Sequence, residues 1–179
     1  MATELPAFYY LDNFRHVLEH VKLLYAELLS TDEQDFCQRF LALSPSAQAL
    51  LVRLLNRKGE LFRSDKLYYP EIGDLHTAAA ELEKASLLRI CSADDLDHLA
   101  ASRWLTLFTR PELQTWARRA LNTAGFPIAA QRAMRRDELQ SHVETLLEAR
   151  QLMPQQLLLQ PCWLLPDSAR TVLATLLLL

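Results

Sequence analysis

The residues with the plainest potential for metal chemistry lie near the N-terminus. His16, Glu19 and His20 spell H-x-x-E-H, and a helix would place both histidines on one face, as a zinc site requires. The pattern fixes only three residues, and no third ligand can be identified. Because four-residue spacing recurs by chance in helices, the favoured interpretation is a solvated helix face. The alternative, a metalloenzyme, can be tested by metal analysis of the purified protein.

A second group of possible ligands is acidic. Asp94, Asp95 and Asp97 stand together beside His98, and three neighbouring carboxylates could hold a divalent metal. The favoured interpretation is that acids gather in the first turn of a helix, where they complement the helix dipole. The chain has no glycine-rich phosphate loop and no recognisable Ser/His/Asp or Cys/His signature. We therefore predict neither a catalytic nor a metal-binding residue in this chain.

Positive charge follows a clearer pattern. Between Arg53 and Lys66 five basic residues face two acids, a local net charge of +3, whereas residues 71–100 carry seven acids and two bases. A basic edge beside an acidic block indicates a directional surface, and the alternative is a merely solvated turn. Four side chains in the basic stretch are predicted to bind DNA: Arg57, Lys58, Arg63 and Lys66.

A second basic group is predicted to contact the DNA backbone and consists of Arg118, Arg119, Arg132, Arg135 and Arg136. Arg135 and Arg136 stand where a helix should begin, and the free N–H groups of a helix start favour phosphate. Arginine at that end is otherwise disfavoured by the helix dipole, and such a local conflict is expected at a functional site. The predicted chemistry is sequence-independent phosphate contact with a strong dependence on salt.

The composition limits where such a surface can lie and in which compartment. The 179 residues are 50% hydrophobic with a net charge of −3, so any DNA-binding surface must be local. Cys37, Cys91 and Cys162 are far apart and form no C-x-x-C pair, which argues against structural zinc and fits a reducing cytoplasm.

The sequences of the two chain ends bear on targeting, membrane insertion and the extent of the native protein. Residues 1–10 have no signal-peptide pattern, and the apolar run 171–179 is too short to span a membrane. We therefore expect a cytoplasmic protein without a membrane partner. The last helix has no capping residue at its end, which predicts that the native protein continues beyond Leu179.

The elements that must position these groups are mainly helices. Apolar spacing and capping residues predict helices over 11–29, 32–43, 45–58, 71–86, 94–101, 109–121, 135–150 and from Ser168 onward, with an extended stretch at 61–69, a strand at 87–91, a loop at 122–131 and a connector from Met153. The predicted N-caps are Asp12, Ser44, Ser92, Thr109 and Ser168, and Gly59 is the predicted residue after a helix end.

Two stretches of the chain resemble a known family. Residues 9–14 read YYLDNF, and residues 40–71 read FLALSPSAQALLVRLLNRKGELFRSDKLYYPE. A leucine–serine pair, a glutamine, a V-R-L helix, an R-K turn and a final Tyr69-Pro70-Glu71-Ile72 resemble the N-terminal region of the Fanconi-associated nuclease family. These are repair nucleases with a C-terminal VRR-type nuclease domain.

The second stretch, residues 105–147, is similar to the SAP module of the same family. Leu113, the Trp116-Ala117 pair, Arg135 and Leu139 take the positions of its helix pair. The resemblance implies a mainly α fold: a helical N-terminal domain with winged-helix-like features and a short β element, then a SAP-like helix–loop–helix. The implied domains are 1–103, 104–152 for the SAP-like module, and 153–179 as a connector and the start of a further helical region.

The resemblance also implies an activity for the complete family enzyme. That activity is a metal-dependent phosphodiesterase, using Mg or Mn, which cuts 5′ flaps and interstrand-crosslinked DNA while the N-terminal and SAP regions hold the duplex. The expected partners are branched or flapped double-stranded DNA and the rest of the same polypeptide. Near its end this sequence lacks the glutamate-x-lysine motif of the PD-(D/E)xK nuclease core. Arg170 falls where some family members bind a terminal phosphate, although its neighbours match poorly.

One interpretation without DNA binding remains open. A helical module whose charged face meets another protein would also account for these elements, and the net negative charge favours it. A salt series of DNA binding separates the two hypotheses, because a protein-binding module would leave DNA affinity near background.

Overall fold

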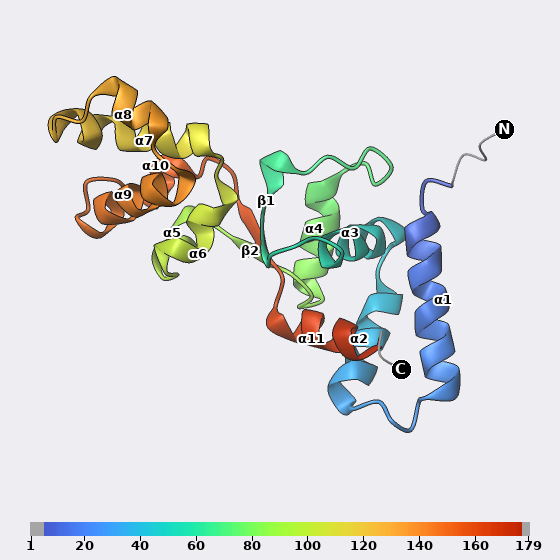
Figure 1. Cartoon of the computed structure of the whole chain (residues 1–179). Helices are drawn as coiled ribbons and strands as arrows, with labels where there is room; N and C mark the ends of the chain where they lie inside the picture. Colours follow the sequence, from blue (N-terminus) through green and yellow to red (C-terminus); the bar gives the residue numbers. More distant parts are fainter. Residues whose placement is uncertain (1–5, 177–179) are drawn as a thin grey trace. The chain divides into compact units, whose positions relative to one another are not determined.

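The structure is a computed structural model that describes residues 6–176, apart from the side chains of Arg119, Thr123 and Leu173 (Figure 1). The described chain forms two compact units. The first unit holds residues 6–62, 66–90 and 163–176, and the second holds residues 63–65 and 91–162. The two units are described one at a time.

The first unit is a helical domain with one continuous core. Its helices are α1 (Tyr9–Leu24), α2 (Thr31–Ala42), α3 (Pro45–Leu55), α4 (Leu75–Lys84) and α11 (Asp167–Leu176). Helix α3 is the central element, because it packs against both α1 and α4, and nearly all its apolar side chains are buried. Each large apolar side chain buried in this way contributes roughly 1.5–3 kcal/mol.

Capping residues fix where these helices begin. Ser30 and Glu33 form a reciprocal capping box at α2, Ser44 accepts a hydrogen bond from the backbone N–H of Ala47 at α3, and Asp74 caps α4. Each such cap is worth about 1 kcal/mol. The predicted cap at Ser44 is therefore confirmed.

Three short strands form the sheet, and each contains the point where the chain passes from one unit to the other. The strands are β1 (Leu61–Arg63), β2 (Arg89–Cys91) and β3 (Cys162–Leu164), in the order β1-β3-β2. The backbone pairs Glu60 with Leu165 and Ser64 with Pro161, so β1 and β3 run antiparallel. Trp163 and Leu165 enter the core of the first unit, which ties the end of the described chain to its beginning.

The second unit is also mainly helical, with two main helices, α7 (Arg110–Thr123) and α9 (Arg136–Glu148), and several short ones. The short ones are α5 (Ala93–Asp97), α6 (Ala101–Trp104), the 3₁₀ helix η2 (Leu105–Leu107), α8 (Ile128–Ala133) and α10 (Pro154–Leu157), and a further 3₁₀ turn, η1, spans Ser64–Lys66. Helices α7 and α9 pack together through fully buried Leu113, Ala117, Leu139 and Val143. Trp104 and Phe108 add an edge-to-face aromatic pair.

The predicted fold class, mainly α with a short β element, is confirmed. The capping boxes at Ser92 and Thr109 and the strand before Ser92 are also confirmed. The compact units differ from the predicted segments 1–103, 104–152 and 153–179, because α5 contacts α6 and α10, whereas Trp163 belongs to the first core. As functional divisions those three segments remain predictions.

Several predicted boundaries in the first unit were wrong. Helix α1 ends at Leu24, its N-cap is Phe8 instead of Asp12, and Leu28 is 69% exposed although its spacing placed it on the buried face. Helix α3 ends at Leu55, so Gly59 lies in the following turn, where its φ of 88° suits glycine. The extended stretch 61–69 holds only a three-residue strand before a 3₁₀ turn.

Other wrong boundaries concern α4, the second unit and the last helix. Helix α4 begins only at Leu75, and the helix predicted over 94–101 is two, α5 and α6. The loop predicted at 122–131 contains α8, and the connector contains α10 and the strand β3. The last helix already includes Asp167, so Ser168 is not its N-cap. The end at residues 177–179, on which continuation was predicted, lies outside the described residues.

None of the helices in residues 6–176 is long and apolar enough to cross a membrane.

Candidate nucleic-acid interface

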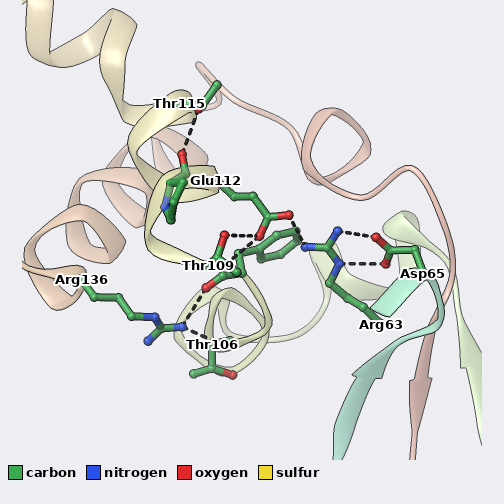
Figure 2. A network of polar contacts seen from close by, with 9 residues as sticks. Arg63, Asp65, Thr106, Thr109, Glu112, Thr115 and Arg136 are labelled. Atoms are coloured by element: carbon green, nitrogen blue, oxygen red, sulfur yellow. Dashed lines mark hydrogen bonds and ion pairs between the residues drawn. The ribbon is translucent and has the colours of Figure 1, made fainter. Parts of the chain in front are cut away.

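Arg63 is the centre of a polar network in the second unit (Figure 2). Its Nε and Nη2 donate to the two carboxylate oxygens of Asp65 at 3.0 and 2.6 Å, and its Nη1 donates to Oε1 of Glu112 at 2.8 Å. The guanidinium carbon lies 4.6 Å from the centre of the Phe108 ring. The Arg63 side chain is only 11% exposed, so its charge is already matched by two carboxylates and largely withdrawn from solvent.

Glu112 joins this network to the start of α7. Its Oε2 accepts hydrogen bonds from the backbone N–H and the hydroxyl of Thr109 at 2.7 and 2.8 Å, which is the predicted capping box. Burial alone would raise the pKa of Glu112, but the bonds from Thr109 and Arg63 outweigh burial and lower that pKa to about 2. The carboxylate is therefore ionised at neutral pH, and both its oxygens are in use.

Arg136 and Arg135 take part in different hydrogen bonds. Arg136 is exposed, and its Nη2 donates to the carbonyls of Thr106 and Phe108 at 2.8 and 3.1 Å, which satisfies the end of η2 (Figure 2). The Arg135 side chain is also exposed, while its backbone N–H donates to the carboxylate of Glu138 at 2.6 Å. Glu138 thus already occupies a donor at the start of α9 that was predicted to favour phosphate.

Arg118 and Arg132 line a hollow on the second unit. The hollow has a volume of about 320 Å³ and is lined by Gln114, Arg118, Asn122, Ile128, Gln131 and Arg132. Both arginine side chains are exposed, and neither has a partner among the residues that the structure describes. The side chain of Arg119 lies outside the described part of the chain. The fold therefore brings these two arginines of the second basic group to one hollow, from two different helices.

The first basic group follows the end of α3 and the turn after it. Arg57 and Lys58 are exposed, and Nη1 of Arg57 donates to the Tyr69 hydroxyl at 3.1 Å. Lys66 is exposed as well. Arg53 is different, because Glu71 holds its Nη2 at 2.6 Å and the Tyr10 ring lies 3.9 Å from its guanidinium carbon. Of the four residues predicted to bind DNA here, Arg57, Lys58 and Lys66 thus belong to the first unit, while Arg63 belongs to the second.

Arg170 supports the same turn. Its Nη2 donates to the backbone carbonyls of Arg57, at 2.9 Å, and Gly59. The expectation that Arg170 binds a terminal phosphate is not tested by these contacts, which give the side chain a structural role in holding the turn beside Lys58.

The side chains considered as possible metal ligands take part in ion pairs and hydrogen bonds within the chain. Nδ1 of His16 lies 3.7 Å from a Glu19 carboxylate oxygen on an exposed helix face. Asp95 caps α5, Asp97 pairs with Arg150 at 2.9 Å, and Asp94 accepts a hydrogen bond from Gln155. Within residues 6–176 no three His, Cys, Asp or Glu side chains are grouped as metal ligands would be.

Cys37, Cys91 and Cys162 are all buried, and no disulfide joins any of them. Burial raises the pKa of the Cys162 thiol to about 12 and also raises that of Cys37. Thiols in this state are protonated at neutral pH and are poor nucleophiles or metal ligands.

Sequence reasoning missed the amides that shape the hollow. Gln131 is 4% exposed, and its Nε2 donates to Oδ1 of Asn122 and to the carbonyl of Phe126, both at 2.8 Å. Buried glutamine is uncommon unless all its polar atoms are bonded. Because residues 122–131 were predicted as a loop, nothing in the sequence indicated that Gln131 would turn inward.

The fold is a helical domain with a small sheet, joined to a helical unit that presents unpaired arginines. Residues 8–89 match the family described as FAN1, HTH domain. This match confirms the resemblance of that part of the chain to the N-terminal region of Fanconi-associated nucleases.

Curated relatives of the chain are also Fanconi-associated nucleases. The chain is 42% identical over 104 residues to the Fanconi-associated nuclease 1 homolog of Pseudomonas aeruginosa, covering 51% of this chain and 19% of the relative. It is 33% identical to the homolog of Oryza sativa and 36% identical to Fanconi-associated nuclease 1 of Homo sapiens, covering 59% and 62% of this chain and 11% of each relative. The matched stretches thus make up at most about a fifth of the length of these relatives.

Solved structures extend the similarity over nearly the whole chain. A crystal structure of paFAN1 bound to DNA with a two-nucleotide 5′ flap and a gap superimposes with a TM-score of 0.76 and 31% identity, covering 98% of this chain and 30% of that one. A second, with a one-nucleotide flap, gives a TM-score of 0.74 and 31% identity, covering 97% of this chain and 30% of that one.

Proposed function

We propose that this chain binds the phosphate backbone of branched or flapped double-stranded DNA. The observation that carries the proposal is the likeness, over 98% of the chain, to paFAN1 bound to 5′-flap DNA. In this proposal the chain is the DNA-binding front portion of a structure-specific 5′ flap endonuclease that acts in DNA repair, including interstrand crosslink repair. The metal-dependent phosphodiesterase chemistry, with Mg or Mn, belongs to the rest of the same polypeptide, and the compartment is the cytoplasm.

The proposed contacts come from two groups of basic residues. Arg57, Lys58 and Lys66 form the first group, and Arg118, Arg119, Arg132, Arg135 and Arg136 form the second. Such side chains can replace the counterions that condense on DNA, which makes affinity fall steeply with salt. Arg63 is left out of the proposed contacts, because moving it to a phosphate would leave Asp65 and Glu112 with unmatched charges.

The experiment is a fluorescence titration of a 5′-flap duplex with the chain across a salt series. Replacing Arg135 and Arg136 together by alanine should weaken binding equally for flap duplexes of different sequence. The salt slope is the slope of the logarithm of the binding constant against the logarithm of the salt concentration. The double variant should reduce its magnitude by roughly one to two units, since the lost contacts are to phosphate. An unchanged isotherm and slope would contradict the assignment of these two residues.

The second candidate function is a protein-binding module without DNA affinity. Exposed leucines at the end of α1 and just beyond it, namely Leu23, Leu24 and Leu28, favour it, as does the net charge of −3. The same salt series decides between the candidates, because this module would leave DNA affinity near background at every salt concentration.

A further inference from the structure

The hollow between α7 and α8 has a fixed shape because the turn between these helices is locked. The N–H of Phe126 donates to the Leu121 carbonyl at 2.9 Å, and the N–H of Gly125 donates to the Asn122 carbonyl at 3.0 Å. This is a Schellman motif, and it needs the left-handed φ of 75° that Gly125 supplies. The chain therefore returns along α7 at a fixed angle.

The buried amide of Gln131 and its neighbours hold α8 against α7. Besides the two bonds that Gln131 donates, its backbone carbonyl accepts from Nε2 of Gln114 at 3.0 Å. Arg110 adds hydrogen bonds from Nε and Nη2 to the Met134 carbonyl at 3.0 and 2.9 Å, at the end of α8. Nη2 of Arg110 also donates to the Arg132 carbonyl, so these hydrogen bonds hold α8, which carries Arg132, against α7, which carries Arg118.

The polar groups of the hollow that are still able to bind a ligand are mainly hydrogen-bond donors. Oδ1 of Asn122 already accepts from Gln131, so the group that Asn122 has to offer is its Nδ2 donor. Arg118 and Arg132 each add a guanidinium, and no acid is among the residues that line the hollow. A hollow of about 320 Å³ with two unmatched positive charges and an amide donor fits a tetrahedral anion.

We propose that this hollow holds one phosphodiester group of the DNA backbone, shared between Arg118 and Arg132 and approached by Nδ2 of Asn122. The inference rests on the proposed function and goes beyond it, because it assigns both arginines to a single phosphate. Gln131 is a positioning residue, which fixes Asn122 and α8 through its side-chain amide.

The salt slope of DNA binding tests directly whether Arg118 and Arg132 contact the same phosphate. With one shared phosphate, Arg118→Gln or Arg132→Gln alone leaves the slope nearly unchanged, because the other arginine still neutralises the phosphate. The double variant then lowers the slope by about 0.9. If the two arginines contact separate phosphates, each single variant lowers the slope by about 0.9 and the double variant by about 1.8. That result, or an unchanged slope in the double variant, overturns the inference.

The two proposals fail in different ways. If the unaltered chain shows no salt-dependent DNA affinity, the proposed function fails. If it binds DNA and the variants give the slopes of separate phosphates, only the shared site fails. Arg150→Gln is the matched control, because Arg150 is an exposed arginine of the same unit that is paired with Asp97 and should leave the slope unchanged.

A second measurement uses inorganic phosphate as the probe in amide NMR of the full chain. Phosphate raised to millimolar concentrations should shift the amides of residues 114–132 and leave those around Arg150 in place. Asn122→Asp, which puts a carboxylate into the hollow, should abolish these shifts while the thermal unfolding curve stays intact. Shifts that persist in Asn122→Asp, or that spread evenly over the chain, would show that phosphate is not held in this hollow.

Discussion

Arg63 and Arg118 are the same residue type in one compact unit, yet their surroundings give them opposite uses. Arg63 is 11% exposed, and it donates to two carboxylates and lies over an aromatic ring. Arg118 is exposed, lines a hollow without acids, and has no partner among the described residues. The difference teaches that a basic residue in a basic stretch of sequence is available to bind DNA only if the fold leaves its charge unmatched.

The largest expected effect on stability comes from the network around Arg63. Glu112→Gln removes a charged acceptor from Arg63 and weakens the cap of α7, so the free energy of unfolding should drop by about 2–3 kcal/mol. Urea unfolding followed by circular dichroism measures this drop. A loss below about 0.5 kcal/mol would mean that the network is no more than a surface ion pair.

The same network predicts a dependence of stability on pH. The pKa of Glu112 lies at about 2 in the folded chain, against an ordinary value of 4.5. Because the folded value is the lower one, the stabilisation is fully present above pH 4.5 and is lost as pH falls towards 2. Denaturant midpoints measured across this range should fall less steeply in Glu112→Gln than in the unaltered chain, and parallel curves would contradict the assignment.

A matched pair of variants separates the two kinds of arginine. Arg63→Gln should lower the unfolding free energy by about 2 kcal/mol and leave DNA affinity unchanged. Arg118→Gln should leave the unfolding free energy within about 0.5 kcal/mol and reduce DNA affinity about fivefold to tenfold, since a charge-assisted contact is lost. Reversed outcomes, with Arg63→Gln reducing DNA affinity and Arg118→Gln leaving it unchanged, would make Arg63 the DNA ligand.

The smallest expected effect concerns an exposed pair in the same unit. Arg150 binds Asp97 at 2.9 Å with 64% of its side chain exposed. Replacing it by glutamine should change the unfolding free energy by less than about 1 kcal/mol, as for most surface ion pairs. The melting temperature at low and high salt measures the change, and a larger loss would rank this pair with the Arg63 network.

The sequence predicted what depends on local spacing. The capping residues Ser44, Ser92 and Thr109 begin helices where expected, because each cap is set by three or four neighbouring residues. The strand at 162–164 was missed, because it becomes a strand only by pairing with β1 and β2, which lie far earlier in the chain.

The predicted contact residues show the same limit. Charge clustering found Arg118 and Arg132, and the fold does bring them to one hollow. The same clustering also selected Arg63, because no local pattern indicates that Glu112, 49 residues away, would neutralise it. Gln131 was overlooked for a similar reason, since its burial depends on how α8 packs against α7.

The most direct test of the central claim is the affinity of the full chain for a 5′-flap duplex between about 50 and 200 mM salt. If roughly four or five phosphates are contacted, the logarithm of the binding constant should fall with the logarithm of salt at a slope of about −4, which weakens binding by about two to three orders of magnitude over this range. A weak, salt-independent affinity would contradict the claim that this chain binds the phosphate backbone of DNA.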